Sequence, residues 1–101
     1  MKSFGDMVKQ AQKMQKQMTE IQAQLAAERF EATAGGGVVR AVVDGKQMLR
    51  ELKIGPEALK DGDVTLIEDL VLAAVSEAQS ASEKHMNESL GKITGGFPLP
   101  F

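Results

Sequence analysis

The chain has 101 residues, a net charge of −2 and 43% apolar residues, which fits one small domain. It contains no cysteine, which excludes disulfides and thiol chemistry and fits a reducing cytoplasm. Trp and Tyr are also absent, which argues against a stacking platform for single-stranded nucleic acid. No apolar run approaches the roughly 20 residues of a membrane span, and no signal segment opens the sequence, so no membrane contact is expected.

The charge is distributed unevenly along the chain. Residues 1–54 carry 9 basic and 6 acidic side chains, whereas residues 55–101 carry 3 basic and 8 acidic ones. An acidic total argues against a general polycation. A contact with nucleic acid would therefore have to be local, on a lysine-bearing surface in the first half.

Residues 3–28 show the pattern of a long amphipathic helix. Apolar side chains recur at alternating steps of three and four residues, which defines a heptad seam. The seam consists of Phe4, Met7, Ala11, Met14, Met18, Ile21 and Leu25. Ser3 is the expected N-cap, with Asp6 three residues further on. We expect the seam to pack on a second helix.

Lysines lie behind this seam. Lys9, Lys13 and Lys16 stand at i, i+4 and i+7, on one helix face about 10 Å long. A lysine ammonium can meet phosphates without reading bases. The spacing leaves two interpretations open, namely contact with DNA and an ordinary solvated or protein-binding surface.

Residues 29–54 predict a three-stranded antiparallel meander with strands over 29–34, 38–43 and 46–54. Asp44-Gly45 predicts a two-residue type I′ turn between the last two strands. The register set by that turn puts Val38, Val42 and Leu49 on one apolar face. Because such a face is poorly suited to water, we predict that these three residues form a homodimer interface.

A short helical turn is expected at 56–60, followed by a second long helix capped by Asp63 and ending near Leu90. Its apolar stripe narrows to small residues over 78–82, which we expect to receive the methionines of the first helix. An antiparallel pairing of this kind would bring Lys84 near Lys9. Residues 1–91 thus form the expected single domain, and the Gly/Pro-rich residues 92–101 a flexible tail.

The sequence offers little for catalysis. His85 is the single histidine and is expected to be a surface or packing residue. Gly35-Gly36-Gly37 lacks the Lys-Ser/Thr of a phosphate-binding loop, and the Asp61–Asp63 loop lacks the further oxygen ligands that calcium needs. We therefore expect no catalytic, metal or cofactor site, no small-molecule substrate and no enzymatic activity.

Several strings, in order along nearly the whole chain, resemble the YbaB/EbfC family of bacterial nucleoid-associated proteins. They are MQKQM at 14–18, AGGGVV at 34–39, VVDGK at 42–46, IGPE at 54–57, EDLVLAAV at 68–75 and TGGFPLP at 94–100. The resemblance implies an α+β fold and a tweezer-like homodimer whose long helices project as arms.

The same resemblance implies a function. Members of the family bind double-stranded DNA, change its conformation and take part in nucleoid organisation and gene regulation, so a cytoplasmic, nucleoid location is expected. The arms would contact DNA through Lys9, Lys13 and Lys16 of the first helix and Lys84 of the second. The alternative is a dimeric protein-interaction module that acts through its helical arms or its C-terminal tail.

Overall fold

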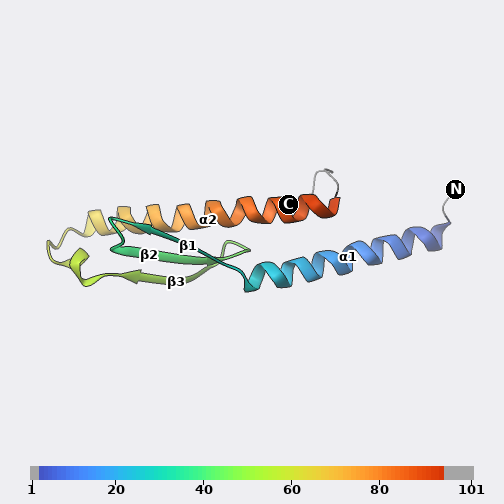
Figure 1. The fold of residues 1–101 in the computed structure, drawn as a ribbon, viewed down its shortest axis with the longest axis horizontal. Coiled ribbons are helices and arrows are strands. Elements are labelled where there is room, and N and C mark those ends of the chain that lie inside the picture. The colour runs from blue at the N-terminus through green and yellow to red at the C-terminus, as the bar shows by residue number, and fades with distance from the viewer. Residues whose placement is uncertain (1–2, 95–101) are drawn as a thin grey trace.

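Two long helices and one three-stranded sheet make up an elongated molecule of 70 × 20 × 16 Å (Figure 1). The computed structural model describes residues 3–94. The elements are α1 (Phe4–Ala27), β1 (Arg29–Ala34), β2 (Val39–Asp44), β3 (Leu49–Ile54), the 3-10 helix η1 (Pro56–Leu59) and α2 (Val64–Thr94). The α+β class and the element order are those that the sequence predicts. α2 continues past the predicted end near Leu90, so residues 92–94 of the expected tail are helical, and residues 95–101 lie outside the described part.

Both long helices begin at the caps that the sequence predicts. The Ser3 hydroxyl oxygen accepts a hydrogen bond from the Asp6 amide over 3.2 Å. At the start of α2, the Asp63 carboxylate accepts one from the Leu66 amide over 3.0 Å. Each cap satisfies an amide that has no partner within its helix, so side chains fix where α1 and α2 begin.

The core lies between α2 and the first two strands of the sheet, whose order is β1-β2-β3. Ala74 and Ala78 of α2 are fully buried and pack in two clusters with residues of β1 and β2. Their small side chains let the helix approach the sheet closely. The expectation that the small residues of α2 receive the methionines of α1 is therefore wrong, because the sheet occupies that stripe.

The turn between β2 and β3 differs from the prediction. The Gln47 amide donates to the Asp44 carbonyl, and the Asp44 amide donates to the Met48 carbonyl, which encloses a three-residue loop. Gln47 takes the left-handed conformation, with φ of 68°. A turn followed by one left-handed residue is the usual three-residue hairpin connection, and it replaces the predicted two-residue type I′ turn.

A β-bulge shifts the register further. Val43 pairs with Leu49, but Val42 pairs with Glu51, so Arg50 is the additional residue. Leu49 therefore lies on the α2 side of the sheet, whereas Val42 lies on the opposite side. Val38 packs against the cluster beneath α2. The predicted common face of Val38, Val42 and Leu49 is thus wrong.

The side of the sheet away from α2 carries charges instead of an apolar surface. Arg40 bonds Glu31 at 2.7 Å and Glu51 at 3.0 Å, and Lys53 lies 3.5 Å from Glu51. The hydrogen bond from Arg40 holds the pKa of Glu31 below its usual value. Val42 is only 6% exposed between the two glutamate positions, so this side of the sheet is suited to water.

Candidate nucleic-acid interface

The N-terminal part of α1 projects from the body of the molecule (Figure 1). Every residue from Ser3 to Gln17 is exposed, and Met18 is the first that is half-buried. Leu25, near the other end of the helix, is only 2% exposed. We call residues 3–17 the arm and residues 18–27 its base.

Backbone and side-chain bonds fix the base of the arm. The Gly45 amide donates to the Leu25 carbonyl over 2.7 Å, which ties the β2–β3 turn to the end of α1. Arg29 caps the same end, because its guanidinium donates to the carbonyls of Ala26 and Glu28 over 2.9 and 2.8 Å. The bond to Ala26 provides a partner for a carbonyl in the last turn of the helix, and the Leu25 carbonyl accepts from the Glu28 amide as well as from Gly45. Together these bonds set the direction in which the arm leaves the sheet.

His85 of α2 also contacts the end of α1. Its Nε2 lies 2.6 Å from a Glu28 carboxylate oxygen, and its ring packs against Phe30 with 5.4 Å between ring centroids. The expectation of a packing residue is confirmed. Sequence reasoning missed this pairing with Glu28, since nothing in the local pattern links residues so far apart in the chain.

The β2–β3 turn is itself held by a buried carboxylate. Asp44 is fully buried and accepts hydrogen bonds from the amides of Lys46 and Met48, over 2.8 and 3.1 Å. Arg50, re-aimed by the bulge, donates to it over 2.9 Å. Burial raises the pKa of Asp44, but the two amides and the guanidinium outweigh it and hold the pKa below its usual value. The Ser82 hydroxyl donates to the Asp44 carbonyl over 2.7 Å, which joins the turn to α2.

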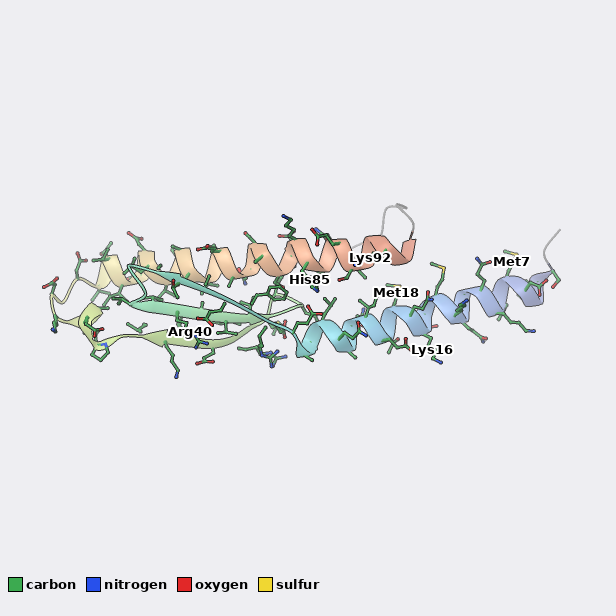
Figure 2. The ribbon with its side chains drawn as sticks, in the orientation of Figure 1. Met7, Lys16, Met18, Arg40, His85 and Lys92 are labelled. Carbon is green, nitrogen blue, oxygen red and sulfur yellow. The ribbon has the colours of Figure 1, made fainter. Side chains whose placement is uncertain are left out.

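The three predicted lysines lie together on the arm. Lys9, Lys13 and Lys16 are all exposed, and no ion pair within residues 3–94 involves them. In Figure 2, Lys16 projects from the side of α1 opposite Met7 and Met18. The arm thus presents ammonium groups to solvent on one side and apolar side chains on the other.

Lys84 does not join this group. It is exposed on α2, in a shallow hollow that it shares with Glu83 and Glu88. Its neighbour His85 contacts Glu28, which is 19 residues, or roughly 28 Å of helix, from Lys9. The expectation that Lys84 lies near Lys9 is wrong, because α2 reaches α1 at the base of the arm.

Other kinds of site find no matching arrangement in the described part of the chain. Within residues 3–94, no group of three or more His, Asp or Glu side chains is placed to hold a metal ion. None of the helices there is both long and apolar enough to cross a membrane. The lysine side of the arm is therefore the candidate interface that the geometry offers.

Comparisons with known proteins agree with this arrangement. Residues 1–97 match the YbaB/EbfC DNA-binding family. A nucleoid-associated protein of Clostridium acetobutylicum is 41% identical over 98 residues, which cover 97% of this chain and 88% of the relative. A nucleoid-associated protein of Caldanaerobacter subterraneus is 42% identical over the same shares. The chain therefore belongs to the YbaB/EbfC DNA-binding family.

A solved structure shares the fold. The crystal structure of an uncharacterized protein from Helicobacter pylori superposes with a TM-score of 0.87, over 94% of this chain and 100% of the other. The two sequences are only 18% identical, so this likeness concerns the fold alone.

Proposed function

We propose that this nucleoid-associated protein binds double-stranded DNA through phosphate contacts made by Lys9, Lys13 and Lys16. The observation that carries the proposal is the arm itself, which holds on one exposed helix face three lysines that form no ion pair with any residue from 3 to 94. Flexible ammonium groups at this spacing suit a row of phosphates and carry no base-reading geometry. Binding is accordingly expected to be salt-sensitive and largely independent of sequence.

The proposal includes a homodimer, which would present two arms to one duplex. Its support is the edge strand β3, since the core clusters beneath α2 draw on β1 and β2. Leu49, Leu52 and Ile54 are 40–46% exposed on the α2 side, and Met48 beside them is 60% exposed. Of the three residues predicted for the interface, Leu49 remains accessible, whereas Val42 is covered within its own chain.

Two arms on one duplex would change its conformation, because phosphate contacts made at separate points restrict the path of the DNA. Such a protein would act in nucleoid organisation and gene regulation, in the nucleoid of a bacterial cytoplasm. Lys84, between two glutamates on α2, would contribute less than the lysines of the arm.

A triple substitution tests the assignment. Lys9→Gln, Lys13→Gln and Lys16→Gln remove the charges and retain helix-forming side chains. We expect weaker binding by the same factor on duplexes of unrelated sequence, and a salt slope lower by about 0.9 per lost contact. The control with an equal charge change is Lys46→Gln, Lys53→Gln and Lys60→Gln, all exposed and off the arm. Equal losses in both variants would contradict the assignment to the arm.

A further inference from the structure

The apolar seam of α1 loses its cover where the arm begins. Leu25 is 2% exposed and Met18 is half-buried, but Met14 is 41%, Met7 60% and Phe4 81% exposed. From Met14 to Phe4 the uncovered stripe is about 15 Å long. A continuous exposed apolar stripe of this kind marks a surface that another segment covers. It lies on the side of the arm opposite Lys16 (Figure 2).

α2 ends where this stripe begins. His85 contacts Glu28, and Leu90 lines a cavity between the helices with Gln22 and Leu25, so α2 runs antiparallel along the base of the arm. Nine residues beyond His85, Thr94 reaches the level of about residue 19 of α1. Figure 1 accordingly shows α2 ending alongside the middle of α1.

The chain that continues from this point has the chemistry and the length to cover the stripe. Residues 95–101, Gly-Gly-Phe-Pro-Leu-Pro-Phe, carry no charged side chain and three large apolar ones. Pro98 and Pro100 lack an amide hydrogen and restrict the residues before them to extended backbone. Seven such residues span about 22 Å, which matches the distance along α1 from about residue 19 to Phe4.

We propose that residues 95–101 lie along the exposed seam of their own chain, with Phe97, Leu99 and Phe101 against the side chains from Met14 to Phe4. α2 itself ends pointing in the direction in which the arm projects, so a segment that continues from Thr94 needs no reversal to reach the seam. Its tether to Thr94 keeps it at a high effective concentration at the seam, which a second copy of the chain lacks. The docked segment leaves the lysine side of the arm free, so this proposal does not depend on DNA binding.

Methyl NMR of the full chain without DNA tests the proposal. A nitroxide is attached at Pro100→Cys, which is the sole thiol of that variant, and the methionine methyl groups are labelled with ¹³C. The doubly labelled chain is diluted into an excess of unlabelled chain. We expect the nitroxide to broaden the signals of Met7 and Met14. The signal of Met48, which lies in the β2–β3 turn beside the base of the arm, should stay sharp and serve as the reference.

Two variants make the outcome specific. Phe97→Ser with Phe101→Ser should abolish the broadening, whereas Leu72→Ser, at a 66% exposed position on α2, should leave it unchanged. Sharp Met7 and Met14 signals in the diluted sample would overturn the proposal. Broadening that arises only when the nitroxide and the ¹³C label are on different chains would also overturn it, and would assign the seam to a second copy.

Discussion

The Gly45 amide donates a 2.7 Å hydrogen bond to the Leu25 carbonyl, so the tip of the β2–β3 hairpin contacts the last turn of α1. A Cβ atom on residue 45 would lie 2.5 Å from that carbonyl oxygen and 2.8 Å from the Leu25 Cα. The φ of Gly45 is not positive, so its backbone conformation does not require glycine. Glycine is needed here because the two backbones approach each other closely. The direction of the arm thus depends on a residue of the sheet.

Gly45→Ala should destabilise the protein, because backbone atoms on both sides of the contact must move apart. We expect a loss of about 1–3 kcal/mol in the free energy of unfolding, measured by urea denaturation. Gly91→Ala is the control, since a Cβ there meets nothing within 4 Å in α2. It should stabilise by about 0.5–1 kcal/mol, and a loss of similar size in both variants would contradict the contact argument.

Ser82→Ala should cost about 1 kcal/mol of the same free energy of unfolding. The substitution removes the buried hydrogen bond to the Asp44 carbonyl, but that carbonyl retains its bond from the Gln47 amide. Ser76→Ala changes an exposed serine on the same helix and should stay within about 0.5 kcal/mol of the wild type. Indistinguishable urea midpoints for the two variants would show that the bond from Ser82 contributes nothing.

The Asp44 carboxylate makes stability depend on acid pH. The pKa of Asp44 is lower in the folded state than in the unfolded state. Its contribution to the free energy of unfolding is therefore complete above the pKa of the unfolded state, about 3.9, and is lost as the pH falls through the pKa of the folded state. Urea midpoints of the wild type and of Asp44→Asn, measured from pH 7 to pH 2, should therefore converge below about pH 4. A constant difference across this range would contradict the role of the ionised carboxylate.

Glu31→Gln provides the comparison for that titration. Arg40 also lowers the pKa of Glu31, but this carboxylate is exposed to solvent, which screens the pair. At neutral pH, Glu31→Gln should lower the urea midpoint less than Asp44→Asn does. This difference from the wild type should fade in the same pH range. A larger effect for Glu31→Gln would show that the charged side of the sheet, and not the turn, dominates the acid response.

The sequence was sufficient to predict the types and order of the elements. The seam of α1 fixes a helical period over more than six turns, and the caps Ser3 and Asp63 act through neighbouring amides, which makes them local features. The shared, exposed face of the arm lysines also follows from helical spacing alone. These features depend on residues close together in the chain, so a periodic pattern is enough to find them.

The register of β3 could not be predicted in the same way. It depends on the left-handed Gln47 and on the bulge at Arg50, and that bulge is stabilised by the bond from Arg50 to a buried carboxylate. The pairing of α2 was missed for a related reason, because its small-residue stripe suits a sheet as well as a helix. The contact of His85 with Glu28 joins residues with no local pattern between them.

Fluorescence anisotropy of a labelled duplex of about 20 base pairs, titrated with the protein at 50 and 200 mM salt, tests the central claim most directly. The logarithm of Kd rises with the logarithm of the salt concentration with a slope of about 0.9 per phosphate contact. Three contacts on one arm therefore predict a Kd about 40-fold higher at 200 mM than at 50 mM salt. Both arms of a dimer would raise this factor to the order of 10³. Equal Kd values at the two salt concentrations, or no saturable binding at 50 mM, would contradict a phosphate contact made by the arm.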